Sequence, residues 1–316
     1  MCETVSNNSS LECLAVPPER VRHLLRWIHF DLSENDFATL LDDVEPRLVA
    51  EPKLTLLQII EGGSPVAAAY FIRLDGSVAT LGGLRATSGF EAQAGLLLQE
   101  FQGLLNRAGI AQIQALLNVD NLSSRMVMLN SPFRQVTTVR QLCLDLHNVS
   151  PTAELPLVGY TCQPASQFTR RDVEALVEAT FSGSLDCPVL EGLRTGSEVV
   201  QGFLESQAWD QSLPWWVLCD GPTPIGCALV NTHLEGSFEF AYTGLIQSVR
   251  GRGLGRALVD YAIRICRERG GSYVTTAVDS QNWPACKIYD SLGFTEIREL
   301  AVWLPKVAKN HQVAAA

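Results

Sequence analysis

The sequence is short of positive charge. Its 24 Lys and Arg residues stand against 34 Asp and Glu residues, and the formal net charge is −10. A basic face supplies most of the affinity of nucleic-acid-binding proteins, so this balance argues against a nucleic-acid partner. The sequence also lacks a run of the roughly 20 apolar residues that a membrane-spanning helix needs. We therefore expect neither a nucleic acid nor a membrane as partner.

Paired cysteine patterns are also missing. The nine cysteines are scattered, with no Cys-x-x-Cys pair and no histidine at metal-ligand spacing. This excludes the usual zinc motifs, and an odd, scattered set is typical of a reducing compartment rather than of a disulfide framework. The N-terminus has Glu3 and no uninterrupted apolar stretch, unlike a signal peptide. We expect a cytoplasmic protein without a bound metal.

What is present is enough apolar sequence for two cores. The chain has 316 residues, 47% hydrophobic and 18% charged, which is a soluble globular composition. Strand and helix patterns follow one another twice, on either side of a Pro-containing linker at 150–156. The predicted helices are 18–28, 33–41, 90–107, 122–129, 167–181, 197–206, 253–269 and 283–292. The predicted strands are 54–60, 66–72, 78–84, 113–117, 133–146, 158–162, 215–219, 225–232, 238–246, 273–278 and 294–304.

The two halves share one order of elements. At an offset of 161, residues 83–133 align with the second half without gaps, with six identities that include Gly109/Gly270 and Phe133/Phe294. The ends of the helices coincide as well. We interpret this as an internal duplication, with domains at 11–149 and 157–305.

A glycine- and arginine-rich stretch in the second half is the clearest functional signal. Three alternate glycines and three arginines stand immediately before a helical pattern. Such glycines let backbone N–H groups approach a ligand, and the helix N-terminus and the arginines add positive charge, which suits a polyphosphate. The stretch lacks the Lys-Ser/Thr of a Walker A loop and the acidic residue of a dinucleotide-binding fingerprint. A flexible basic turn is the alternative. The six residues are Arg250, Gly251, Arg252, Gly253, Gly255 and Arg256.

The context of this stretch resembles the acyl-CoA loop of the GNAT acyltransferase superfamily. Arg250, Gly253 and Gly255 fit that family's Arg/Gln-x-x-Gly-x-Gly/Ala pattern, after a strand at 238–246. A second stretch, 282–294, resembles the family's Asn-x-x-Ala-x-x-x-Tyr-x-x-x-Gly-Phe element. The resemblance covers 158–305 well and 11–146 only by pattern.

The resemblance implies a fold and an activity. The expected fold class is α/β (α+β): two tandem GNAT-like domains, each with a mixed, mostly antiparallel sheet, helices on both faces and a parallel strand pair that splays apart. The expected activity is N-acetyl transfer, with acetyl-CoA as co-substrate and a primary amine as acceptor that attacks directly in a ternary complex. The acceptor would be a small metabolite, a protein N-terminus or a lysine. An acyl-CoA-binding regulatory protein without turnover, or transfer of a longer acyl group, are the alternatives, and an oligomer is left open.

The same resemblance implies a ligand site. Backbone groups at the end of the strand 238–246 would pair with the pantetheine and the thioester carbonyl, and amides of the glycine-rich stretch would hold the pyrophosphate. Asn282 would touch the cofactor, or serve only as a helix N-cap. Arg256 would bind phosphate, or be a solvated helix charge. The backbone set is Thr243, Gly244, Leu245 and Ile246, then Arg250, Gly251, Arg252, Gly253, Leu254, Gly255 and Arg256.

Two catalytic roles are also implied. Tyr289 would protonate the leaving thiolate, and its alternative is a core tyrosine with its hydroxyl at the edge. Glu239 would take the amine proton, because uninterrupted alternation gives it the parity of Thr243 and Leu245. The alternative for Glu239 is a solvated strand carboxylate, and His233 is the second candidate base.

The segment 181–194 would select the acceptor. It contains Asp186 and Glu191, which would bind an amine, or simply face solvent.

The first half departs from this pattern. At the same offset Glu91 stands opposite Arg252, and a carboxylate beside a pyrophosphate is repulsive. Met128 stands opposite Tyr289 and has no proton to give. We therefore predict that the first half has lost acyl-CoA binding and catalysis. It would be structural, or would complete the substrate pocket.

Overall fold

The computed structural model describes residues 13–49, 53–148, 159–204, 214–233 and 236–306. The predicted linker at 150–156 lies outside these residues. The described residues form two compact units, one within the ranges 1–74, 78–135 and 303–316, the other within 75–77 and 136–302. In the part described, no helix is long and apolar enough to cross a membrane.

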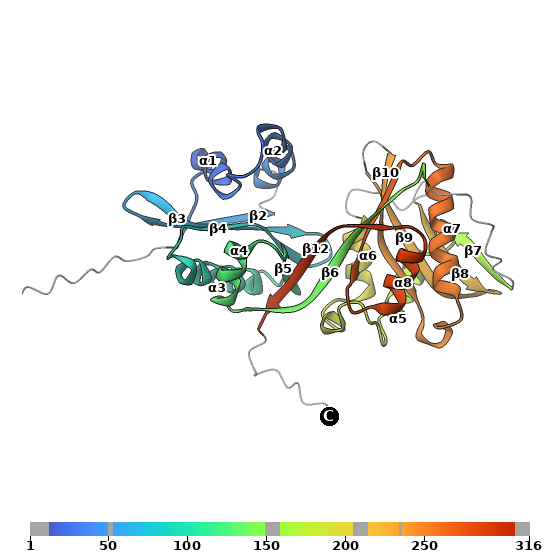
Figure 1. Ribbon diagram of the computed structural model, residues 1–316. Helices are drawn as coiled ribbons and strands as arrows, with labels where there is room; N and C mark the ends of the chain where they lie inside the picture. Colours follow the sequence, from blue (N-terminus) through green and yellow to red (C-terminus); the bar gives the residue numbers. More distant parts are fainter. Residues whose placement is uncertain (1–12, 50–52, 149–158, 205–213, 234–235, 307–316) are drawn as a thin grey trace, which may run out of the picture. The chain divides into compact units, whose positions relative to one another are not determined.

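The N-terminal unit is a mixed sheet with helices on both faces. Residues 66–72 of its central strand are all buried, which requires cover on each side, and Figure 1 shows α1 and α2 on one face and α3 and α4 on the other. The strand order is β1-β2-β3-β4-β5, antiparallel except for the parallel pair β4 and β5. The strands are β1 (Cys13–Ala15), β2 (Leu54–Glu61), β3 (Ser64–Leu74), β4 (Val78–Ala86) and β5 (Gln112–Asn118). The helices are α1 (Pro18–Ile28), α2 (Glu34–Val49), α3 (Glu91–Arg107) and α4 (Leu122–Leu129).

The C-terminal unit repeats this plan. One core cluster packs α7 and α8 against the sheet, and a second packs α5 and α6 against the opposite face. The strand order is β12-β6-β11-β10-β9-β8-β7, in which β10 and β11 are the parallel pair. The strands are β6 (Phe133–Asp145), β7 (Tyr160–Pro164), β8 (Trp215–Asp220), β9 (Thr223–Thr232), β10 (Ser237–Leu245), β11 (Tyr273–Asp279) and β12 (Thr295–Pro305). The helices are α5 (Arg170–Ala179), α6 (Gly196–Leu204), α7 (Leu254–Glu268) and α8 (Trp283–Ser291).

The last strand of each half is divided between the units. Residues 136–145 of β6 belong to the C-terminal unit, where they pair antiparallel with β11. Residues 303–305 of β12 belong to the N-terminal unit. The domain ranges 11–149 and 157–305 stay a prediction, and the contacts give each unit a piece of the other half.

The parallel pair of the C-terminal unit separates where the site lies. Register between β10 and β11 runs only from Ser237 opposite Tyr273 to Phe240 opposite Thr276. Beyond Phe240, β10 continues to Leu245 with β9 as its partner. The predicted splay is present, and it leaves backbone groups of the second half of β10 without a strand partner on the β11 side.

Most predicted elements fall within a few residues of the observed ones, and α2 is the main exception. It was expected at 33–41 but extends to Val49 and includes Pro46. The first helix of the second half begins later than expected, at Arg170. Thr169 and Asp172 form a capping box there, which satisfies the first free N–H groups.

Candidate active site

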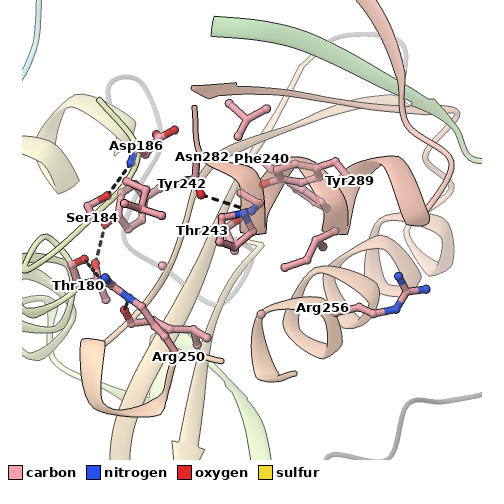
Figure 2. Close-up of a pocket in the computed structure, with 18 of the residues that line it drawn as sticks. Thr180, Ser184, Asp186, Phe240, Tyr242, Thr243, Arg250, Arg256, Asn282 and Tyr289 are labelled. Carbon is pink, nitrogen blue, oxygen red and sulfur yellow. Dashed lines mark hydrogen bonds between the residues drawn. The ribbon is translucent and has the colours of Figure 1, made fainter. Parts of the chain in front are cut away.

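A pocket of about 640 Å³ opens where β10 and β11 separate. Its walls come from the loop after α5, the second half of β10, the turn before α7, the end of β11 and the start of α8. Figure 2 shows these side chains around one cavity. Most of the predicted site residues line it: Thr243, Gly244, Leu245, Arg250, Gly251, Gly253, Gly255, Arg256, Asn282 and Tyr289.

The glycines place the start of α7 against this pocket. Gly253 is the N-cap of α7, with a φ of 81°, a conformation that other residues adopt at a cost. At Gly255 a Cβ atom would lie 3.3 Å from Cδ1 of Ile288, so a larger residue would press on α8. The first N–H groups of a helix have no intrahelical partner, and Gly253, Gly255 and Arg256 at this helix start line the pocket. The turn is therefore built to receive an anion.

Arg250 lines the pocket, and its guanidinium is bonded to the surrounding backbone. Its Nε donates to Leu245 O (3.0 Å), and its Nη atoms donate to Gly183 O (2.6 Å) and Thr180 O (2.8 Å). Figure 2 shows this side chain reaching toward Thr180. The guanidinium thus ties the loop after α5 to the end of β10, and its donors are used by backbone carbonyls.

The other two arginines also have protein partners. Arg252 donates to Ser248 O at 3.0 Å and is exposed. Arg256 donates to Ser291 Oγ, and in Figure 2 its guanidinium points away from the other labelled residues. The three arginines of the stretch therefore have protein partners, and its glycines Gly251, Gly253 and Gly255 line the pocket beside them.

Three of the predicted positions, Ile246, Arg252 and Leu254, do not line the pocket. Ile246 does not line the pocket, and its N–H donates to Ile225 O at 3.0 Å. Leu254 is buried in the core against α8 and is 6% exposed. Neither Leu254 nor Arg252 is among the lining residues.

Tyr289 lines the pocket from α8. It is 6% exposed, and its ring packs edge-on against Phe294 with centroids 5.1 Å apart. Burial raises the pKa of Tyr289, and the nearby hydroxyls of Thr276 and Thr243 offset part of this. Its phenol is therefore protonated at neutral pH, as an acid must be. Thr243 Oγ1 itself is buried and has no hydrogen bond of ordinary geometry in the described residues.

Glu239 is not brought to the pocket. A β-bulge between Phe240 and Tyr242 breaks the alternation on which its predicted direction rests. Phe240 packs in the α7–α8 cluster whereas Tyr242 packs in the α5–α6 cluster, so parity changes at Ala241. Glu239 Oε2 accepts a hydrogen bond from His233 Nε2 at 3.1 Å, and both side chains are about half exposed, at 43% and 53%. The structure thus pairs the two candidate bases with each other.

Asp186 and Asn282 are two further residues of the predicted site that line the pocket. Asn282 caps α8 by accepting from Ala285 N at 3.3 Å, and it also lines the pocket, so both predicted alternatives fit it. Asp186 lines the pocket, whereas Glu191 from the same segment does not. Figure 2 shows Asp186 and Asn282 near one another.

One pocket pair gave no signal in the sequence. The hydroxyl of Thr180 lies 2.6 Å from that of Tyr242, beneath Gly244. A Cβ atom at Gly244 would lie 2.8 Å from Thr180 Oγ1, so the glycine is needed there. The long separation of α5 from β10 and the bulge at Ala241 hide this contact from pattern reading.

The matching turn of the N-terminal unit is occupied by its own side chain. Glu91 Oε2 accepts from the N–H of Gly89 at 3.0 Å, so a carboxylate sits at the amides of this turn. Gly95 lies so close to Asn130 that a Cβ atom would be 2.3 Å from its carbonyl oxygen. Met128 is fully buried in the core. These contacts support the prediction that this half does not bind acyl-CoA.

Known proteins match the part of the chain that contains most of the pocket. Residues 188–294 match the model of the Acetyltransferase (GNAT) family, so this part of the chain is similar to GNAT acetyltransferases. Mycothiol acetyltransferase of Corynebacterium aurimucosum is 29% identical over 136 residues, which are 36% of this chain and 45% of that protein. The enzyme of the same name from Beutenbergia cavernae is 36% identical over 98 residues, 29% of this chain and 32% of that protein. The matches thus span less than half the length of these two relatives.

Solved structures extend the likeness to both units. A GCN5-related N-acetyltransferase from Sphaerobacter thermophilus has a TM-score of 0.62 at 20% identity, over 93% of this chain and 94% of that one. A tandem GNAT protein from the clavulanic acid biosynthesis pathway, without AcCoA, has a TM-score of 0.53 at 15% identity, over 93% and 97%. The expected tandem fold is confirmed. The duplication predicted from the sequence also resembles the tandem arrangement of mycothiol synthase, and this likeness concerns architecture alone.

Proposed function

We propose that this protein is an acetyl-CoA-dependent N-acetyltransferase with its active site in the pocket of the C-terminal unit. One observation carries the proposal: the cavity joins a glycine-capped helix N-terminus to a buried tyrosine across a splayed parallel strand pair. An anion-binding end and a proton-donating end in one cavity suit a long, phosphorylated thioester.

The pocket fits acetyl-CoA by the chemistry of its walls. The N–H groups at the start of α7, at Gly253 and Gly255, would hold the pyrophosphate. The free backbone edge at Thr243, Gly244 and Leu245 would pair with the pantetheine and polarise the thioester carbonyl. The cysteines that the structure describes are not needed as nucleophiles, because an amine attacks the thioester directly.

Tyr289 would deliver a proton to the sulfur as the C–S bond breaks. Its burial keeps the phenol protonated until it is needed, since desolvation disfavours the phenolate. The two relatives are named mycothiol acetyltransferases, and their matches cover at most 36% of this chain. We therefore propose acetyl transfer to a primary amine and do not carry over a particular acceptor. A cytoplasmic location remains part of this proposal.

The test is acetyl-CoA binding followed by turnover. Thermal melts with and without acetyl-CoA should show a higher melting temperature with the ligand, because binding to the folded state stabilises it. Release of free CoA thiol is then followed with alkylamines, amino sugars, amino acids and peptide N-termini. Binding without turnover of any amine would favour an acyl-CoA-binding protein, and no shift in the melt would contradict the proposal.

A further inference from the structure

The pocket contains one carboxylate among its lining residues. Of the described residues in its wall, the side chains that ionise are Asp186, Arg250, Arg256, Tyr242 and Tyr289. Both arginines are bonded to loop or helix oxygens. The negative charge of the pocket wall is therefore that of Asp186, which Figure 2 shows apart from Arg256 of α7.

Asp186 is held in place by a reciprocal contact with the end of β11. The backbone N–H of Asp279 donates to Asp186 Oδ1 at 2.8 Å. In return, Asp279 Oδ2 accepts from the N–H of Cys187 at 3.0 Å, and Oδ1 accepts from the hydroxyl of Thr137 at 2.8 Å. Asp279 is 1% exposed, so these bonds are shielded from water. The segment 181–194 is thus fixed to the sheet at Asp186, the residue that carries the carboxylate.

The backbone next to Asp186 is strained, which indicates that the surrounding contacts hold it in one conformation. Cys187 has a φ of 47°, one of two positive values among the non-glycine residues described. A left-handed residue of this kind costs about 1 kcal/mol or more, and it persists where the surroundings fix it. Here the N–H of Cys187 is aimed at Asp279, and Asp186 is presented to the pocket.

The surroundings of Asp186 favour a base. It is open to the water of the cavity, but protein lies on most sides, and this desolvation raises the pKa of its carboxyl. The charge of Asp279 raises the pKa further, whereas the N–H of Asp279 and the amide of Asn282 lower it. Tyr242, Tyr289 and Cys187 also face it, and its charge raises the pKa of each.

We propose that Asp186 is the general base that deprotonates the amine acceptor. This inference rests on the proposed acetyl transfer, and it assigns the acceptor to the class of primary amines that reach the pocket as ammonium ions. Glu239 and His233, the alternatives from the sequence, are paired with each other and do not line the pocket.

The protons and bonds balance as follows. The ammonium nitrogen gives one proton to Asp186, and Asp186 passes this proton to water. The lone pair of the resulting amine nitrogen then attacks the thioester carbonyl. The C–N bond forms and the C–S bond breaks. The nitrogen then loses a second proton to solvent. Tyr289 gives its proton to the thiolate and regains one from solvent, so these two transfers cancel. The products are an amide, free CoA and one proton.

The test compares Asp186→Asn with Glu191→Gln. Asparagine keeps the oxygen that accepts from Asp279 N and removes the base, so kcat at saturating acetyl-CoA and amine should fall about 100-fold while the Kd for acetyl-CoA is unchanged. Glu191→Gln removes a carboxylate of the same segment that does not line the pocket, and its kcat should equal that of the wild type. The amine used is the fastest one in the wild-type panel.

The pH profile separates a base from a structural role. A base acts when deprotonated, so wild-type kcat should fall as the pH drops through the raised pKa of Asp186, and this acid limb should be absent in Asp186→Asn. Asp186→Glu keeps a carboxylate and should keep the limb, even if its stability is lower. An unchanged kcat and acid limb in Asp186→Asn would overturn the inference. A wild type that binds acetyl-CoA and acetylates no amine would instead overturn the proposed function, on which the inference depends.

Discussion

At the scale of single residues, the arginines of the pocket hold neighbouring segments in place, whereas the tyrosine offers a group that can react. Arg250 contacts three backbone carbonyls, and Arg256 contacts Ser291. Tyr289 instead presents a buried phenol to the cavity. The charges of the glycine-rich stretch therefore support the site, and the chemistry is left to other side chains.

Replacing Tyr289 by phenylalanine removes the proton donor and keeps the ring against Phe294. Without an acid the thiolate must leave unprotonated, so kcat should fall about 100-fold, with little change in the KM for acetyl-CoA. Steady-state kinetics measure both. Tyr261→Phe is the control, because Tyr261 lies on α7 against Trp216 and does not line the pocket.

The pH dependence of that acid follows from its environment. Burial raises the pKa of Tyr289 above its ordinary value of 10.0. An acid acts when protonated, so Tyr289 should cause no fall in kcat below about pH 10. A wild-type rate equal to that of Tyr289→Phe across this range would remove the acid role.

The sequence could place Tyr289 and Asn282 because local motif spacing sets both. It could not place Glu239, because residues 238–240 follow the regular alternation of a strand. No residue in this stretch indicates the bulge at Ala241. The three-carbonyl contact of Arg250 was missed as well, since its partners lie 67 and 70 residues away in Gly183 and Thr180.

At the scale of elements, the loop after α5 and the end of β10 are held together by Arg250. Arg250→Ala should lower the free energy of unfolding by about 2 kcal/mol, because three carbonyls lose charged donors at a partly exposed site. Acetyl-CoA affinity should fall with it, as the loop lines the pocket. Denaturant unfolding and calorimetry measure the two effects. In Arg252→Ala, which loses a single exposed bond within its own turn, stability should change little. Equal stability of the two variants would argue against the clamp.

The N-terminus of α7 is the element that should hold the pyrophosphate. At Gly253 a Cβ atom meets nothing within 4 Å, so Gly253→Ala should cost about 1 kcal/mol from its positive φ alone. In the pocket the same methyl group should weaken acetyl-CoA binding about tenfold by standing between ligand and amides. Titration calorimetry measures the Kd.

Gly270→Ala is the matched control for that prediction. Gly270 follows the other end of α7, has a φ of 79° and also has open space around a Cβ atom. The two variants should lose similar stability, and affinity should fall only in Gly253→Ala. A loss of affinity in both variants would show that strain in α7, not contact with the ligand, controls binding.

Element boundaries were largely readable from the sequence, because caps and stops are local. Gly270 and Gly109 end their helices with positive φ, and apolar spacing marks α7. The length of α2 was not readable, since Pro46 inside a helix is usually a sign of its end. The division of β6 and β12 between the units was not readable either, because strand partners depend on contacts far apart in sequence.

At the scale of the whole molecule, the two units should differ in function although they share a fold. The turn of the N-terminal unit is already occupied by Glu91, whereas that of the C-terminal unit lines a cavity. Titration calorimetry with acetyl-CoA should therefore give one site per chain, and Gly253→Ala should weaken that site. Binding of two molecules per chain would mean that the Glu91 carboxylate gives way to phosphate.

The central claim is acetyl transfer from acetyl-CoA to an amine in the pocket of the C-terminal unit. The most direct measurement is one assay that quantifies both products: free CoA by its thiol and acetylated amine by mass spectrometry. We predict equal amounts of the two, formed only when the amine is present, and loss of both together in Tyr289→Phe. Release of CoA without an acetylated amine, or an undiminished yield from Tyr289→Phe, would contradict the account.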